Sequence, residues 1–318
     1  MWRVRILLMG MVLSAMAGWA LSERLGVLLQ LAGPPVAASA GAISEHDLEE
    51  LNAMAPQDQA ARLLEKAINH YRGAGEEIAK RLDRWTGKMA PSKELESLTN
   101  TAYFSSDLRV RAMALEIWLA RDNLPKTPET VERLIAGAGV RDDRQYWRLS
   151  NLGILGNRGV EPERVLRTLL EYVHDPSGET RASAINGLGL LGSEGTIAPL
   201  LEILRWDKSA DLRERAACNL ADSGLLTHEL RRKAIPELIR FGGDESLDAA
   251  TRKWAFQALR EIAEQNLPDD AAAWQKWYAG RRASSSPRHP TCSCFRNPDG
   301  NLTVCLPQAS RYSRTLKS

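Results

Sequence analysis

Histidine and cysteine side chains are the groups in this sequence that could bind a metal or act as nucleophiles. Three of the four cysteines, Cys292, Cys294 and Cys305, fall near the end of the chain, where His289 could supply a fourth ligand. A Cys-x-Cys pair is weak evidence for a metal site, because three cysteines could equally form one disulfide and leave an odd thiol. We therefore expect no metal and no cofactor, and the redox state and role of these cysteines stay open.

The other candidate chemical groups do not converge on one site. His46, His70 and His174 fall in different predicted helices or turns, without His-x-x-x-His spacing, and His228-Glu229 is a single pair. The glycine-rich run at 187–192 looks like a nucleotide-binding loop, but it lies within and at the end of a predicted helix, not after a strand. The sequence predicts no catalytic residues, so we expect a protein that is not an enzyme.

The histidines and the glycine-rich run named above fall in or between helices that recur along the chain. Asp175-Pro176 ends one helix, Ser177 is of a type that caps the next, and Gly192 can adopt the left-handed conformation that ends it. A second helix follows from Thr196. Apolar residues at steps of three and four define the inward face of the two helices: Ala184, Ile185, Leu188 and Leu191, then Ile197, Leu200, Leu201 and Leu204. Such a pair buries too little surface alone and needs stacked neighbours.

Copies of this pair flank it on both sides. The Arg-x-x-Ala-x-x-x-Leu skeleton of 181–191 recurs at 213–223 and 252–262, and more weakly at 145–156 and from residue 111. Each copy is followed by a predicted partner helix, at about 127–138, 161–173, 196–205, 228–241 and 269–278. The uneven spacing between copies is typical of helix pairs joined by loops of variable length.

The stretch at 175–204 resembles a HEAT repeat. Its Asp-Pro-x-x-x-x-Arg-x-x-Ala-x-x-x-Leu-Gly-x-Leu-Gly pattern with a following Pro-Leu-Leu is similar to the repeats typified by phycobilisome-lyase-like proteins. The body over about 105–280 is also similar to uncharacterised bacterial HEAT-repeat proteins. The resemblance implies an all-α, right-handed α-solenoid of about five helix pairs, with a concave face made of the second helix of each pair.

Three enzyme classes also resemble such arrays. Deoxyhypusine hydroxylases bind iron through repeated His-Glu pairs, whereas this chain has one. HEAT-like DNA glycosylases use a basic concave face with tryptophans. Here most of the four tryptophans Trp118, Trp147, Trp206 and Trp254 are predicted to take inward helical positions, and the body is net acidic. Phycobilin lyases need a bilin pocket, which a sequence does not reveal. An enzyme of the lyase or hydroxylase type is therefore the alternative function, and nucleic-acid binding is less favoured.

The two ends of the chain differ from its body. Arg3 and Arg5 precede an uncharged run from Ile6 to Leu21, so residues 1–24 are predicted to be a signal peptide or a signal anchor. We expect either a membrane-anchored protein that faces the periplasm or cell exterior, or a secreted one if the segment is cleaved. Residues 25–43 are predicted to be a linker, and residues 281–318 a disordered, basic, cysteine-containing tail.

Two domains are predicted between these ends. Residues 44–104 should form an N-terminal helical cap, which covers the open end of the repeat array at 105–280. Its first helix should begin at Ser44, with Asp47 three residues on, and its second at Pro56. At the other end of the array, Trp274, Trp277 and Tyr278 are expected to cover the final repeat.

The distribution of formal charge along the chain indicates the class of ligand that the protein binds. Of the formal net charge of +2, residues 281–318 contribute +6 and residues 1–40 contribute +2, which leaves −6 for the body. An acidic body is not typical of nucleic-acid binding. We therefore expect a non-catalytic scaffold that binds an unknown protein or peptide on its concave face. The candidate contacts are polar residues of the second helices: Arg164, Arg167, Glu171, Glu202, Arg205, Glu237 and Arg240.

Overall fold

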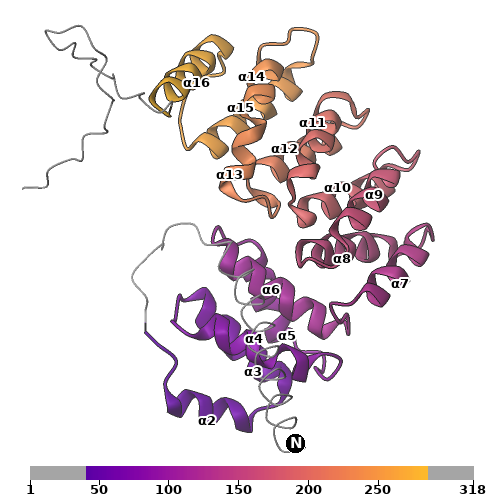
Figure 1. Ribbon diagram of the computed structural model, residues 1–318, viewed down its shortest axis with the longest axis vertical. Helices are drawn as coiled ribbons and strands as arrows, with labels where there is room; N and C mark the ends of the chain where they lie inside the picture. The colour runs from indigo at the N-terminus through magenta and orange to yellow at the C-terminus, as the bar shows by residue number, and fades with distance from the viewer. Residues whose placement is uncertain (1–40, 286–318) are drawn as a thin grey trace, which may run out of the picture. The chain divides into compact units, whose positions relative to one another are not determined.

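The computed structural model describes the backbone of residues 41–285 and the side chains of residues 41–281, and this part of the chain contains helices and no β-strand (Figure 1). The predicted signal or anchor segment at 1–24, most of the linker, and residues 286–318 of the predicted tail, with Cys292, Cys294 and Cys305, lie outside the described residues. The predicted disorder is wrong for residues 281–285, which continue the last described helix. Between residues 41 and 285 no helix has the length and apolar character that a membrane span requires. The chain divides into two units, which end and begin at Ala271 and Ala272.

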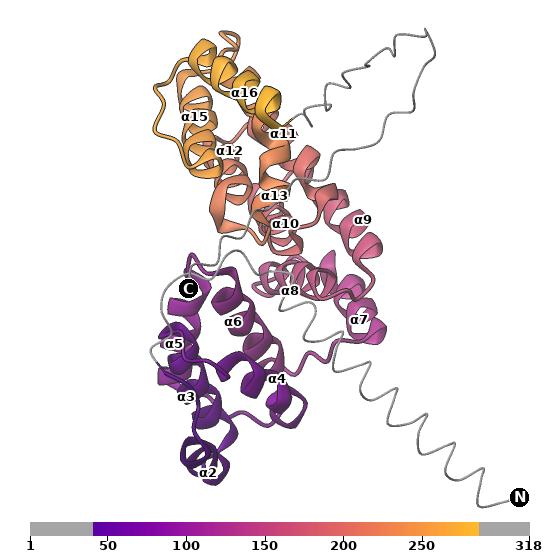
Figure 2. The same cartoon turned by 60° about the vertical axis from the view of Figure 1, so that its left-hand side comes forward.

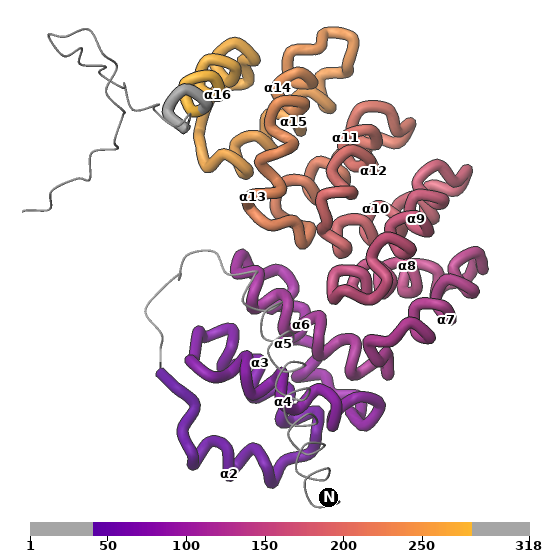
Figure 3. The backbone as a smooth tube through the Cα atoms, in the orientation of Figure 1, coloured from indigo at the N-terminus to yellow at the C-terminus, as the bar shows by residue number. Residues whose placement is uncertain are grey.

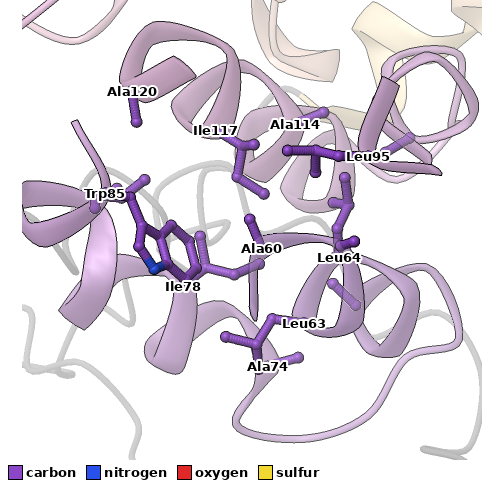
Figure 4. Packing of buried hydrophobic residues seen from close by; sticks show 14 of the residues in the cluster. Ala60, Leu63, Leu64, Ala74, Ile78, Trp85, Leu95, Ala114, Ile117 and Ala120 are labelled. Atoms are coloured by element: carbon purple, nitrogen blue, oxygen red, sulfur yellow. The ribbon is translucent and has the colours of Figure 1, made fainter. Parts of the chain in front are cut away.

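Five helices make up the amino-terminal part of the first unit. They are α2 (Glu45–Ala53), α3 (Pro56–Ile68), α4 (Ala74–Trp85), α5 (Lys93–Tyr103) and α6 (Leu108–Arg121). Ser44 caps α2 as the sequence predicts, because its hydroxyl accepts a hydrogen bond from the amide of Asp47 while the Asp47 carboxylate accepts one from the amide of Ser44. Buried side chains from all five helices form one core, in which Leu63, Leu64, Ile78 and Trp85 are almost fully buried (Figure 4).

The repeat array continues in this unit at the positions that the sequence predicts. Its helices are α7 (Pro128–Ala138), α8 (Gln145–Asn157), α9 (Pro162–Tyr172), α10 (Gly178–Leu191), α11 (Ile197–Trp206), α12 (Ala210–Cys218), α13 (His228–Arg231), α14 (Ile235–Gly242) and α15 (Ala249–Ala263). A π-helical turn, η2 (Asn219–Ser223), extends α12, and a short 3-10 segment precedes α11 and another precedes α14. Leu188 and the other predicted inward positions of 175–204 are buried.

The helices pair in a different register from the expected one. We expect residues 177–192 to pair with residues 196–205, but α11 packs mainly on α12 and touches α10 only slightly. The closest antiparallel partners are instead α7 with α8, α11 with α12, and α14 with α15, while α9 packs as extensively on α10 as on α8, its expected partner. The expected register is wrong because each helix is apolar over a broad stripe, and such a stripe does not show which of its two chain neighbours it faces.

This register defines two layers. We call α7, α9, α11 and α14 the outer helices, and α6, α8, α10, α12 and α15 the inner helices (Figure 3). Helices α8 and α10 lie side by side and make the most extensive contact in the molecule (Figures 1 and 2). Glycine permits this approach: a Cβ atom on Gly153 would lie 2.2 Å from the carbonyl oxygen of Gly187. The outer helices α9 and α11, in contrast, barely touch.

Because the inner helices approach each other more closely than the outer ones, this stretch of the first unit bends toward the inner side. Arg111 of α6 spans the bend, since it donates hydrogen bonds to the carbonyl oxygens of Asp222, Ser223 and Gly224 at 2.6, 3.1 and 3.2 Å. The expectation that the second helices of the predicted pairs line the concave face is therefore wrong. Those helices are α9, α11 and α14, which belong to the outer layer.

A buried group of charges joins α6 to the array. Glu116 accepts hydrogen bonds from Arg158 at 2.6 Å and from Lys126 at 2.7 Å, and Arg158 also donates to the carbonyl oxygen of Ala112. Burial alone would raise the pKa of Glu116, but the two cations outweigh it, so the pKa is lowered and the carboxylate stays charged. This group fixes the turn after α8 against the middle of α6.

The second unit contributes one described helix, α16 (Ala271–Ser285). Trp274 is fully buried, whereas Trp277 and Tyr278 are partly exposed, and the two indole rings meet edge to face at 5.6 Å between their centroids. The expected role of these aromatic residues at the final repeat stays a prediction.

Candidate binding surfaces

All seven predicted contact residues lie on outer helices. Arg164, Arg167 and Glu171 belong to α9, Glu202 and Arg205 to α11, and Glu237 and Arg240 to α14. Among them, Arg167, Glu171 and Glu202 are exposed and have no ion-pair partner in the part of the chain that the structure describes. The other four residues form ion pairs with side chains of this chain.

The engaged residues form ion pairs within the outer layer. Arg164 forms one ion pair with Glu132 of α7 and a second with Glu161, in which the nitrogen and oxygen lie 3.2 Å apart. Glu237 and Arg240 pair with each other one turn apart, and Arg205 pairs with Asp244 at 3.1 Å. The structure therefore does not gather the seven residues into one site, and of the seven Glu202 is the residue that lines the cavity described below.

Exposed aromatic side chains gather elsewhere, where α5 ends and the inner helices α6 and α8 meet. We call this set the aromatic strip: Tyr103, Phe104, Trp118, Tyr146 and Trp147. The Phe104 side chain is 80% exposed and that of Tyr146 48%. The Tyr103 ring meets the rings of Phe104 and Trp118 edge to face, at centroid distances of 5.1 and 6.4 Å.

One carboxylate fixes the two tryptophans of the strip. The indole nitrogens of Trp118 and Trp147 donate hydrogen bonds to the same oxygen of Asp122, at 2.9 and 2.6 Å, and Arg121 donates to the other oxygen at 2.9 Å. Both tryptophans are partly exposed, as is Trp254. The interpretation of these residues as inward core positions is thus only partly correct. A half-buried indole with a satisfied N–H still presents a ring face to a partner.

Arginines border the aromatic strip. The guanidinium of Arg144 lies 5.8 Å from the centroid of the Trp147 ring. Burial raises the pKa of Tyr103, with a further contribution from Tyr146, while the positive charges of Arg111 and of Arg215 on α12 act in the opposite direction. No acidic side chain among residues 41–281 forms an ion pair with Arg144 or Arg215. The strip therefore combines aromatic surface with two uncompensated positive charges.

The sequence alone does not predict that these five aromatic residues form one exposed surface. Adjacent aromatic pairs at a helix end (Tyr103-Phe104) and a helix start (Tyr146-Trp147) are the only local signal. The two pairs are far apart in the chain, and their proximity depends on how α5, α6 and α8 pack.

A cleft with a cavity of about 260 Å³ lies between two consecutive helix pairs. It is lined by the turn after α9 and by the end of α11 with the following turn. Trp206, at its rim, is 65% exposed, and the guanidinium of Arg205 lies 4.5 Å from the centroid of its ring. Trp206 is therefore not among the tryptophans at inward positions, because the α11 face that carries Leu200 and Leu204 turns Trp206 outward.

The remaining candidate chemical groups stay apart. His228 is exposed at the start of α13. Among the side chains that the structure describes, no three His, Cys, Asp or Glu residues come together as metal ligands would. Cys218 of α12 is half-buried, and burial raises the pKa of its thiol, so the thiolate is disfavoured at neutral pH.

Comparison with known protein families agrees with this geometry. A family model for HEAT repeats matches residues 131–221, the segment that runs from α7 to the π-helical turn after α12. This segment contains two of the antiparallel pairs described above, together with α9 and α10. A search of curated proteins finds no match.

Proposed function

We propose that this HEAT-repeat protein is a non-catalytic scaffold that binds a protein or peptide through its aromatic strip. HEAT repeats commonly mediate protein–protein interaction. The observation that carries the proposal is the exposure of Phe104 and Tyr146 beside Tyr103 and the two half-buried tryptophans. Large aromatic side chains gathered at one surface are typical of interaction sites.

The chemistry of the strip favours a partner segment that is both apolar and acidic. Aromatic rings contribute contact area at low cost in conformational entropy, and Arg144 and Arg215 would pair with carboxylates that the partner supplies. The acidic body argues against nucleic acid as the ligand, because a nucleic-acid surface needs an excess of positive charge.

The proposed location of the scaffold depends on the amino-terminal apolar run. If residues 6–21 are retained as an anchor, the repeats would face the periplasm or cell exterior. If the run is cleaved, the protein would be secreted. The basic Arg3 and Arg5 before an uncharged run support this part of the proposal.

Crosslinking in native membranes tests the function. The full-length protein would be crosslinked, purified and analysed by mass spectrometry, together with Phe104→Ser and Tyr146→Ser variants. The matched control is Val140→Ser, since Val140 is an apolar residue that is 53% exposed and lies outside the strip. We expect one dominant partner that both strip variants lose and that the control retains.

Two results would contradict the proposal. A partner that binds equally well to all three variants would place the interaction elsewhere on the molecule. A purified protein that carries a chromophore or a metal and no partner would instead favour an enzyme of the lyase or hydroxylase type.

A further inference from the structure

The cleft beside Trp206 lies where two outer helices end. One wall is the turn at 173–176 after α9, and the other is the last turn of α11 with residues 207–208. The carbonyl groups at the carboxyl end of a helix carry a partial negative charge, and both α9 and α11 end here. Arginines of the chain already occupy these ends, since Arg181 donates hydrogen bonds to the carbonyl oxygens of Asp175 and Pro176 at 2.9 and 3.2 Å, and Arg213 donates one to that of Asp207 at 2.7 Å. The backbone therefore leaves the preference for a ligand charge to the side chains of the cleft.

The charges deepest in the cleft neutralise one another. Arg181 donates hydrogen bonds to both carboxylate oxygens of Asp207, at 2.8 and 3.1 Å, and both side chains are only 6% exposed. Asp175 accepts hydrogen bonds from Arg141 on both of its oxygens, at 3.1 and 3.0 Å. Arg181 joins the two walls, because it bonds both to Asp207 and to the carbonyl oxygens of Asp175 and Pro176, and the two ion pairs leave no net charge for a ligand.

Glu202 and Trp206 are the groups left for a ligand. They lie four residues apart on α11 and so share one face of the helix. Glu202 is exposed, and its carboxylate has no hydrogen-bond or ion-pair partner among residues 41–281. The guanidinium of Arg205, which pairs with Asp244, lies over the Trp206 ring, so this indole takes part in a cation–π contact within the chain, and the ring is 65% exposed.

Lys208 and His174 also line the cleft. Lys208 is exposed, and its ammonium has no acidic partner in the described part of the chain, so its charge opposes the entry of a cation. Its long, flexible side chain allows the ammonium to stay in water. The effect of Lys208 on binding should therefore have the opposite sign to that of Glu202.

We propose that this cleft binds a lysine or arginine side chain of a partner polypeptide, with Glu202 as the ion-pair partner and Trp206 as the stacking surface. The cleft uses residues that the aromatic strip does not contain. A partner could therefore engage one site or both, and the two proposals can fail separately.

Fluorescence anisotropy with a labelled peptide of alternating glycine and arginine tests this site on the full-length protein. Glu202→Gln and Trp206→Leu should each weaken binding about 2- to 5-fold, since exposed ion pairs and exposed cation–π contacts have similar strengths. Lys208→Gln should strengthen binding about 2-fold. A peptide of alternating glycine and glutamate should not bind.

Glu171→Gln is the matched control. Glu171 is an exposed carboxylate on α9 without an ion-pair partner among the described residues, and it does not line the cleft. We expect this variant to bind the arginine peptide as the wild-type protein does. Equal losses in Glu171→Gln and Glu202→Gln would mean that the acidic body attracts the peptide without a site.

Two other outcomes would overturn the proposal. They are the absence of any binding of the arginine peptide to the wild-type protein, and weaker binding by Lys208→Gln. Neither outcome bears on the aromatic strip, whose partner is tested by the Phe104→Ser and Tyr146→Ser variants.

Discussion

The amino-terminal helices and the inner helices of the array are packed by different means. In α2 to α5 each helix buries one face, and side chains such as Leu63 and Trp85 fill the space between the helices. Helices α8 and α10 are buried on nearly every side, and their backbones meet directly at Gly153 and Gly187.

This difference determines how each region responds to a change in volume. Where side chains fill the space between helices, neighbouring side chains can shift to absorb part of a change. Where a carbonyl oxygen forms the opposite wall, the helices themselves must move apart. The array should therefore be the less tolerant of the two regions, although both are helical and both are well packed.

A side chain at Gly153 should have the largest effect. A Cβ atom there would lie 2.2 Å from the backbone oxygen of Gly187, so Gly153→Val should lower the free energy of unfolding by about 4 kcal/mol or more. Urea denaturation followed by circular dichroism measures this. Gly178→Ala is the control, because its Cβ would have no neighbour closer than 3.9 Å, and we expect a change within about 0.5 kcal/mol. Similar costs for both variants would show that α8 and α10 are not in direct contact.

Leucine truncation in the two regions sharpens the comparison. Leu188 of α10 and Leu63 of α3 are both fully buried. Leu188→Ala should cost about 3 to 5 kcal/mol, and Leu63→Ala about 2 to 3 kcal/mol, because the side-chain core around α3 can collapse partly onto the cavity. The same denaturation experiment measures both. A larger loss for Leu63→Ala would reverse our view of which region is more rigid.

The charged junction between the regions should give an intermediate effect. Glu116→Gln removes the counter-charge of the buried Arg158, so we expect a loss of about 2 kcal/mol at neutral pH.

The contribution of Glu116 depends on pH in a defined direction. The pKa of Glu116 is lowered in the folded protein from an ordinary value of 4.5. Its stabilising effect is therefore complete above that value and is lost as the pH falls through the lowered pKa. Between neutral pH and acid, the difference in unfolding free energy between wild type and Glu116→Gln should shrink. A difference that is constant over this range would show that the carboxylate is not charged at neutral pH.

The start of α2 should give the smallest effect. Ser44→Ala removes one half of the capping box with Asp47, and we expect a loss of about 1 kcal/mol. Hydrogen exchange of the amides in α2 would show the change locally. Protection that changes in α8 or α10 as well would mean that the two regions open together.

Most of the helices follow from the sequence alone. Capping residues, prolines and glycines act within a few residues of their own position, so Ser44, Pro56, Ser177 and Gly192 mark boundaries that the structure confirms to within a few residues. The inward positions of 175–204, including Leu188, follow from the spacing of apolar residues along one helix. These features depend on local backbone geometry, which the residue types at each position determine.

The register of the pairs and both candidate surfaces required the tertiary structure. A helix with a broad apolar stripe, such as α10, is compatible with either chain neighbour as its partner, and only the packing selects α9. The same holds for the Tyr103-Phe104 and Tyr146-Trp147 pairs, which are linked through Trp118 and Asp122 only because three helices pack together. Trp206 lies at a boundary where one residue of helical rotation, about 100°, decides between core and solvent. Side-chain exposure at such positions depends on contacts between segments far apart in the chain, and a local pattern contains no information about them.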